Sequence, residues 1–321
     1  MSNLRTVIVC LLALALPAAA SAGGRAPGST SLVIAKLPVG ARAAALSGAY
    51  TAVAGEPASL IWNQAGLARD PKTRVEVMHV EQGQRIRVEN AILTQPLIYG
   101  GTAGAYLSYL GQPPIVETKE SAAGDYLGAG RELAVYEFMG GVGYGQDLSR
   151  LTGPSLGPLW SRGSLGASLS ILGQNIAGSR NLTAAVDAGY VYLDENEERS
   201  FGVVFRNLGG AVRGGPLPFA AQAGVAQRIG PVLAVFDVLS GADEVLRGRL
   251  GVEWVLATGA GSFALRAGGQ RSLDNEILAK FSAGLGYRIR MDSGMEFGLD
   301  YAYLPVSYFE DVHAVSIQVG L

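Results

Sequence analysis

The fold of this chain is decided by its last residues, 314–321, which read AVSIQVGL. Aliphatic side chains occupy every second position, and small or polar side chains occupy the positions between them. The same alternation runs through residues 250–256 (LGVEWVL), 280–289 (KFSAGLGYRI) and 295–303 (MEFGLDYAY). A period of two residues is typical of a β-strand with one apolar face. Here the other face is small or polar, which suits a wall between lipid and a polar lumen.

Alternating segments of this kind fill the chain from residue 73 to its end. Most approach the length of a strand that crosses a bilayer, about 9–11 residues. Fourteen segments can be counted: 73–80, 86–95, 102–110, 131–146, 163–174, 182–192, 200–209, 218–229, 231–239, 247–257, 262–270, 278–289, 294–304 and 313–321. An even number is expected of a bacterial single-chain barrel. The pattern therefore predicts an all-β fold, a 14-stranded antiparallel transmembrane β-barrel formed by residues 73–321.

The connections between these segments differ in length in a regular way. Short turns at 194–199, 230–231, 258–261 and 291–294 all follow even-numbered strands. With both ends of the barrel in the periplasm, these turns are periplasmic, and the longer 111–130 connection faces outward. The other connections on the outer side are expected to be short. The 147–162 connection is long for a periplasmic turn, and the pattern does not explain it.

The composition is that of a folded protein poor in charge. Hydrophobic residues make up 49% of the 321 residues and charged residues 16%, against about 25% in an ordinary soluble domain. This combination excludes a disordered chain, which needs low hydrophobicity and high charge. A net charge of −2 offers no basic surface, so no nucleic-acid partner is expected.

The first 22 residues have the pattern of a secretory signal peptide. Arg5 precedes the apolar residues 7–20, and the small residues 20–22 (ASA) form a cleavage site. We expect cleavage after Ala22 and localisation in the cell outer membrane. The single cysteine, Cys10, lies in this peptide. The mature chain would therefore have no disulfide, no cysteine nucleophile and no cysteine-based metal site.

Residues 23–72 do not alternate. The stretch 41–54 is rich in Ala and Gly, and the apolar residues 60–62 (LIW) need burial. Since small residues let short helices pack closely, we predict a short helical N-terminal plug within the barrel. A loose periplasmic tail is the alternative.

Two stretches of this segment resemble a known family. Residues 40–52 (GARAAALSGAYTA) and 62–67 (WNQAGL) are similar to the N-terminal signature of the PorV/PorQ family, outer-membrane proteins related in fold to the FadL long-chain fatty-acid transporters. The positions that carry this plug motif are Gly40, Ala41, Arg42, Gly48, Tyr50, Trp62, Asn63 and Gly66. The resemblance continues at 207–209, 216–218, 264–268, 300–303 and 313–317.

The chain departs from the family pattern in two places. Family members usually have Asn-Pro-Ala-Gly where residues 63–66 read NQAG, and an aromatic residue is commoner at the position of Leu321. They also tend to have an acidic pair near residues 55–56, where this chain reads Gly-Glu. The resemblance implies a FadL-like barrel of fourteen strands with a plug. It further implies one of two activities: type IX secretion of exported proteins in some members, or passage of hydrophobic molecules through a lateral opening in FadL relatives.

The alternation also predicts which charged side chains enter the lumen. They are Arg206, Arg228, Glu253, Arg266, Lys280, Glu296 and Asp300, with Asp187 and Asp237 expected to join them. Buried charges must be paired or hydrated. One interpretation is a salt-bridged lumen that holds the plug, with Arg42 as a partner. The other is a polar pathway gated by the plug, so that deletion of residues 40–68 raises ion conductance.

The chain shows no pattern of an enzyme. The only two histidines of the chain, His79 and His313, fall on the neighbouring first and last strands, in the lipid-facing phase, and are expected to form a pair at the barrel seam. Neither has a nucleophile in the same phase. No spacing of His or carboxylates indicates a metal site, and no glycine-rich segment has the context of a phosphate site. We therefore expect a non-enzymatic protein without cofactor.

Two functions remain open at this stage. The first is docking or shuttling of exported proteins at the cell surface, with an exported protein or a surface secretion complex as partner. The alternative is FadL-like transport of a hydrophobic small molecule. Both require contact with outer-membrane lipid. A general porin is disfavoured by the plug.

Overall fold

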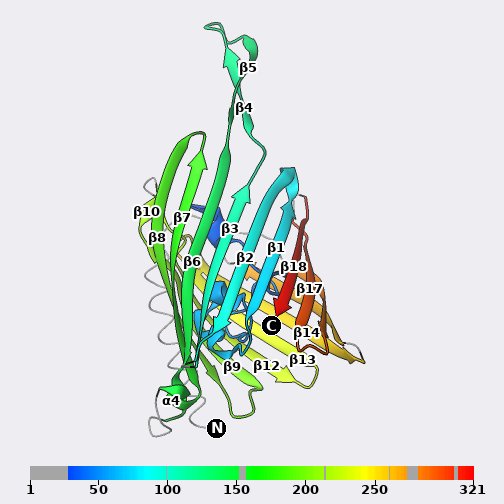
Figure 1. The fold of residues 1–321 in the computed structure, drawn as a ribbon. Helices are drawn as coiled ribbons and strands as arrows, with labels where there is room; N and C mark the ends of the chain where they lie inside the picture. The colour runs from blue at the N-terminus through cyan, green and yellow to red at the C-terminus, as the bar shows by residue number, and fades with distance from the viewer. Residues whose placement is uncertain are drawn as a thin grey trace.

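The computed structural model describes residues 28–98, 100–151, 157–212, 215–259, 261–272, 281–306 and 310–321. The predicted signal peptide and Lys280 lie outside the described residues. Fourteen antiparallel strands close into one barrel, in which β1 pairs with both β2 and β18 (Figure 1). The barrel strands are β1 (Arg74–Gln82), β2 (Ile86–Pro96), β3 (Gly101–Gly111), β6 (Val135–Asp147), β7 (Gly163–Ile176), β8 (Ser179–Leu193), β9 (Arg199–Gly209), β12 (Ala220–Ile229), β13 (Val232–Gly241), β14 (Glu244–Thr258), β15 (Gly261–Ser272), β16 (Phe281–Arg290), β17 (Glu296–Leu304) and β18 (Val312–Gly320).

These fourteen strands confirm the fold class predicted from the alternation. On β18, for example, Val315 and Ile317 are exposed, whereas Ala314 and Ser316 are buried in the lumen. Since the period of a strand is two residues, one pairing register decides the face of every side chain along it. No helix among the described residues is long and apolar enough to cross a membrane.

The two ends of the barrel differ. At the terminal end, β1 begins and β18 ends; the opposite end is called here the hairpin end, because the hairpin of β4 (Ile115–Glu120) and β5 (Tyr126–Leu133) projects from it (Figure 1). This hairpin corrects the sequence-based boundaries. Residues 131–133 belong to β5, so the fourth barrel strand begins at Val135 and not at residue 131, and one connection at this end is long. The boundary differs because residues of the hairpin alternate with the same two-residue period as the residues of β6, which follows it in the chain.

A second small hairpin lies in the β9–β12 connection, formed by β10 (Ala211–Val212) and β11 (Gly215–Pro216). The 3-10 helix η3 (Gly83–Arg85) joins β1 to β2. The β6–β7 connection, unexplained by the sequence, contains η4 (Leu148–Arg150) and α4 (Pro158–Ser161) at the terminal end.

Residues 28–72, called here the plug segment, form four short helices: η1 (Val33–Lys36), α2 (Ala41–Ala45), α3 (Ser59–Trp62) and η2 (Gln64–Arg69). They are too short to be stable alone and depend on packing. Helix α2 contacts β15–β18 and η2 contacts β6–β8, so the segment spans the lumen from one wall to the other.

Glycines of the barrel wall allow this close fit. A Cβ at Gly166 would lie 2.3 Å from the backbone nitrogen of Ala65, and one at Gly284 would lie 2.4 Å from the Cβ of Ala45. The other wall glycines at which a Cβ would lie less than 3 Å from the plug segment are Gly104, Gly143, Gly145, Gly189, Gly202, Gly251 and Gly268. Part of the high glycine content thus serves direct contact between the wall and the plug segment.

Candidate functional site

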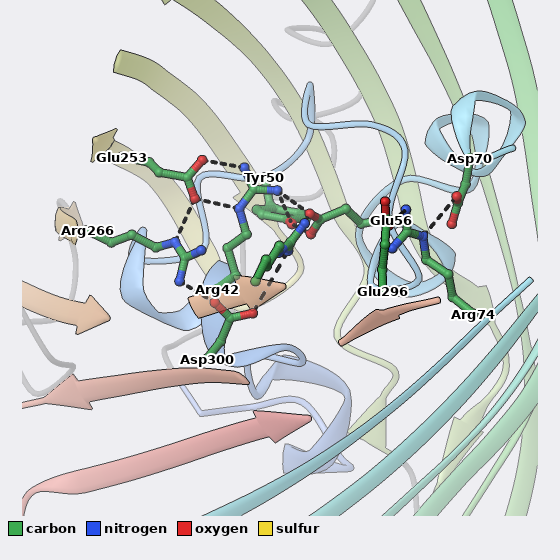
Figure 2. A network of polar contacts seen from close by, with 10 residues as sticks. Arg42, Tyr50, Glu56, Asp70, Arg74, Glu253, Arg266, Glu296 and Asp300 are labelled. Carbon is green, nitrogen blue, oxygen red and sulfur yellow. Dashed lines mark hydrogen bonds and ion pairs between the residues drawn. The ribbon is translucent and has the colours of Figure 1, made fainter. Parts of the chain in front are cut away.

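The centre of the lumen holds a closed ring of six charged side chains: Arg42, Glu56, Glu253, Arg266, Arg288 and Asp300 (Figure 2). We call it the charge ring. Arg42, from α2, donates from Nε and Nη2 to the two carboxylate oxygens of Glu253, at 2.7 and 2.6 Å. Its Nη1 lies 2.5 Å from Oε1 of Glu56. One plug arginine therefore joins a plug carboxylate to a wall carboxylate.

The wall completes the ring. Arg266 donates to Glu253 at 2.6 Å and to Asp300 at 2.5 Å. Arg288 donates to Glu56 at 2.7 Å and lies 3.9 Å from Asp300. The four wall residues come from the consecutive strands β14, β15, β16 and β17; Glu253 and Arg288 lie toward the terminal ends of their strands, and Arg266 and Asp300 lie near the middle of theirs. The ring fastens the plug segment to this side of the barrel.

The ring is balanced in charge and mostly buried. Three guanidinium groups face three carboxylates, and only the Arg288 side chain, at 35% exposed, is open to solvent. Burial alone would raise the pKa of Glu56. The nearby Arg288 and Arg42 guanidinium groups and a 2.5 Å hydrogen bond from the Tyr50 hydroxyl outweigh this effect and hold the pKa well below its usual range. Glu56 is therefore a carboxylate at neutral pH.

The plug-motif residues surround this ring. The backbone nitrogen of Ala41 donates to Ser316 on β18 at 2.8 Å. Gly40 has a φ of 85°, and a Cβ there would lie 3.2 Å from both Ala58 and Glu76. Gly48, with a φ of 73°, leaves space for the Trp62 ring, which lies 2.8 Å from its ideal Cβ position.

Trp62 and Asn63 attach α3 to the rest of the molecule. The Trp62 indole donates to the carbonyl of Val39 at 2.8 Å, and the Arg206 guanidinium lies 5.4 Å from its ring centroid. Asn63 donates to the carbonyls of Thr51 and Tyr190, at 2.8 and 3.2 Å, so it ties the plug to β8.

The Gly66 carbonyl closes the motif by accepting a hydrogen bond from the Gly55 nitrogen at 3.0 Å, and a Cβ on Gly66 would lie 2.9 Å from the Ser59 hydroxyl. Tyr50, fully buried, packs against Trp62 with ring centroids 6.1 Å apart. The eight motif residues are thus brought together as internal contacts of the plug and its attachment to the wall.

Two further lumen acids, Asp237 and Asp187, also bind the plug segment. Asp237 accepts from the backbone nitrogens of Tyr50 and Thr51, both at 2.9 Å, and Asp187 accepts from the Gln64 side chain at 3.3 Å. These contacts show why isolated carboxylates occur on an apolar strand: each one caps donors of a neighbouring chain segment.

The terminal end of the lumen opens into a cavity of about 320 Å³. Its wall includes every member of the charge ring except Asp300. It also includes Arg228, which is exposed at the cavity mouth and not enclosed in the lumen as the alternation predicts. Glu296 lies at the same end and pairs with Lys72 at 2.9 Å and with Arg74 at 3.1 Å; Arg74 also binds Asp70 (Figure 2). Arg228 and Glu296 sit close to strand ends, where side chains reach water.

Toward the hairpin end, the lumen contains an apolar cluster. Leu32 and Ile34, from the beginning of the plug segment, are buried in a cluster with inward-facing residues of β2, β3, β6, β7 and β8, namely Ile92, Tyr106, Met139, Leu172 and Ala185. We call this the apolar chamber. Helix η1, which contains Ile34 and follows Leu32, is held by Glu137, which accepts from the Ile34 nitrogen at 2.8 Å, and by Asp243, which pairs with Lys36 at 2.9 Å.

The two histidines lie outside the barrel and do not contact each other in a hydrogen bond. His79 bonds Glu89 at 2.8 Å, and His313 bonds the Tyr301 hydroxyl at 2.8 Å. In the register of β1 and β18, His313 lies opposite Glu81, two residues beyond His79. Within the described ranges, no cluster of three or more His, Cys, Asp or Glu could hold a metal ion.

Sequence reasoning missed two members of the charge ring. Arg288 alternates with Tyr287 and Ile289, whose lipid-facing phase already places Arg288 in the lumen. Glu56 is noticed only as part of the family signature, because the plug has no period from which a partner could be inferred.

The fold has relatives among solved structures, although no family model and no curated protein matches the chain in sequence. The toluene transporter TodX of P. putida is similar with a TM-score of 0.56 and 9% identity, covering 88% of this chain and 96% of that one. The monoaromatic hydrocarbon channel CymD is similar with a TM-score of 0.54 and 9% identity, covering 91% and 97%. At such identities the likeness shows the fold alone: this chain has a FadL-like barrel.

Proposed function

We propose that this chain is a FadL-like outer-membrane channel that passes hydrophobic small molecules and is closed at rest by its plug segment. The observation that carries the proposal is the apolar chamber at the hairpin end. The chamber is filled by Leu32 and Ile34 of the chain itself. Apolar contacts are non-directional and depend on buried area, so a hydrophobic ligand can replace these two side chains with little net loss.

The likeness to TodX and CymD supports this choice over the docking of exported proteins. Both relatives are named as carriers of monoaromatic hydrocarbons, and we extend this class of ligand to the present chain. Neither is an enzyme by its name, and we assign no catalytic residue, cofactor or metal to this chain. The predicted signal peptide and the lipid-facing strands support export to the outer membrane.

In this proposal the terminal end faces the periplasm and the hairpin end faces the outside. A ligand enters the apolar chamber from the outer side, displaces Leu32 and Ile34, and leaves past the plug. The charge ring keeps the plug attached to β14–β17 during this exchange, because directional ion pairs are not replaced by an apolar ligand. The resting barrel would therefore conduct few ions.

Uptake of radiolabelled toluene tests the proposal, with the full chain in the outer membrane of a host that lacks its own hydrocarbon channels. The chain should increase toluene uptake but not uptake of a hydrophilic trisaccharide. Ile34→Asp should increase toluene uptake further, because a carboxylate cannot stay in the apolar chamber. Val33→Asp is the matched control, since Val33 is 50% exposed on the same helix. A folded barrel with no effect on toluene uptake would overturn the proposal.

One surface, the β4–β5 hairpin, supports the second candidate function, docking of exported proteins. It presents the exposed apolar residues Ile115, Val116, Tyr126 and Leu127 beyond the barrel rim. Deleting residues 115–133 separates the two functions. Under the transport proposal toluene uptake persists without the hairpin, whereas docking through the hairpin would lose its cargo.

A further inference from the structure

The β6–β7 connection places an apolar group at the terminal rim of the barrel. Leu151 is 64% exposed, Leu159 43% and Trp160 44%. The neighbouring β2–β3 turn adds Leu97 and Ile98, which are 43% and 91% exposed. The two connections touch, because an ideal Cβ on Gly100 would lie 2.8 Å from Cγ of Arg150. These five residues are called here the rim patch.

The base of this connection is held rigidly. Arg69, the last residue of η2, pairs with Asp147 at 3.1 Å and donates to the carbonyl of Arg162 and to the Ser164 hydroxyl, both at 3.1 Å. Asp147 precedes the connection, Arg162 is its last residue, and Ser164 follows it. One plug arginine thus clamps both of its ends, and the rim patch is presented at a defined height on the barrel.

The patch lies on the lipid side of the wall and not beneath the lumen. The Tyr190 hydroxyl donates to the carbonyl of Leu159 at 2.6 Å. Tyr190 faces outward, since its neighbours Gly189 and Val191 are buried inside. Its register partner Leu165 is 45% exposed, and Leu169 further along β7 is 55% exposed. The patch is therefore continuous with the apolar band that faces the membrane.

We infer that the rim patch is a membrane-interface anchor that inserts Trp160 and Leu159 into the headgroup region of the glycerophospholipid leaflet at the terminal end. Tryptophan prefers this depth because its ring is apolar and its indole nitrogen is a donor. A large exposed apolar patch on a water-facing rim would be unfavourable. The exposed guanidinium of Arg150, adjacent to Leu151, is placed to meet lipid phosphates. Figure 1 shows α4 at the terminal end of the barrel, below β6 and β7.

Spin labelling in vesicles tests the anchor. The full chain with Cys10→Ala has no other cysteine, so Trp160→Cys carries a single label after folding into phosphatidylcholine–phosphatidylglycerol vesicles. Labels at Trp254→Cys, on the lipid-facing side of β14, and at Asn196→Cys, in the β8–β9 turn, are matched references for lipid and water. The anchor predicts a several-fold lower accessibility to a water-soluble nickel reagent than at residue 196, with oxygen accessibility approaching that at residue 254. Nickel accessibility equal to that at residue 196 would overturn it and leave a periplasmic protein as the occupant of the patch.

A second measurement does not depend on folding of the cysteine variant. The wild-type chain and Trp160→Phe are compared in vesicles of lipids brominated near the headgroup. If Trp160 is inserted, Trp160→Phe lowers the quenched fraction of tryptophan emission. An unchanged or higher quenched fraction in Trp160→Phe would contradict insertion.

Discussion

The two halves of the lumen hold the same plug segment by opposite means. Near the terminal end, the charge ring joins Arg42 and Glu56 to four strands through directional contacts of 2.5–3.9 Å. Near the hairpin end, Leu32 and Ile34 are held in the apolar chamber by packing. The difference teaches which contact can be exchanged for a ligand. An apolar side chain can be replaced by any apolar molecule of similar size, whereas a buried guanidinium needs a carboxylate at a defined position.

Removing the plug should have the largest effect, because both the charge ring and the apolar chamber depend on residues of the plug segment. Deletion of residues 40–68 is expected to raise single-channel ion conductance from near the baseline to that of an open barrel, measured in planar bilayers. Deletion of residues 115–133 is the control, since the β4–β5 hairpin lies outside the lumen. If the plug deletion folds into the barrel and conductance does not rise, the plug segment does not close the lumen.

Breaking the charge ring should cause a large loss of stability that no apolar ligand restores. Glu253→Gln leaves Arg42 and Arg266 without their shared carboxylate, and removing one partner of a buried ion pair costs about 3–5 kcal/mol. Urea unfolding of the protein folded in lipid vesicles measures this loss. Glu198→Gln in an exposed turn should change the free energy of unfolding by less than about 0.5 kcal/mol. Equal midpoints for the two variants would show that the ring contributes no stability.

A loss of packing in the apolar chamber should destabilise the protein, and an apolar ligand should restore part of the lost stability. Ile34→Ala is expected to cost about 2–5 kcal/mol, as for other large-to-small changes of buried aliphatic residues. Added toluene should restore part of this loss by filling the cavity, and it should restore nothing in Glu253→Gln. Val33→Ala, on the exposed side of η1, serves as the control. A toluene effect of the same size in both buried-site variants would remove the distinction between the two halves.

The glycine contacts of the wall should matter to a smaller extent. Gly166→Ala forces a methyl group against the backbone of Ala65, and such overpacking costs about 1–3 kcal/mol. Gly248→Ala meets no atom within 4 Å and is the matched control. Thermal unfolding followed by the gel mobility of the folded barrel compares the two. Identical unfolding temperatures for the two variants would mean that the plug segment moves away from the added methyl group without a loss of stability.

Acid should loosen the ring half of the lumen gradually. The folded-state pKa of Glu56 is lowered, so its stabilisation is complete above the ordinary glutamate pKa of about 4.3 and is lost as the pH falls toward the folded-state pKa. The loss is about 1.4 kcal/mol for each pH unit within that window. Bilayer conductance should rise below about pH 4.3 in the wild type and should depend less on pH in Glu56→Gln. A flat pH profile in the wild type would contradict this linkage.

Much of the architecture follows from local sequence. The fourteen strands, their inward and outward faces and the barrel class follow from a two-residue period, since a strand in a bilayer must show an apolar side chain at every second position. The same rule places Glu253, Arg266 and Asp300 in the lumen, where all three are buried. The rule fails where a strand does not separate lipid from the lumen. This is the case in the β4–β5 hairpin, which projects beyond the barrel rim, and at Arg228, which lies at the cavity mouth.

The pairing of these residues could not be read from the chain. Arg42 and Glu253 are 211 positions apart, and only closure of the barrel around the plug brings them to 2.6 Å. The same holds for Ile34 and Glu137, and for the contact of Arg69 with both ends of the β6–β7 connection. Periodicity by itself determined which face each barrel residue presents, because that depends on neighbours along one strand. The partners were decided by the tertiary structure, because the plug segment has no period and its position depends on the summed fit of many weak contacts.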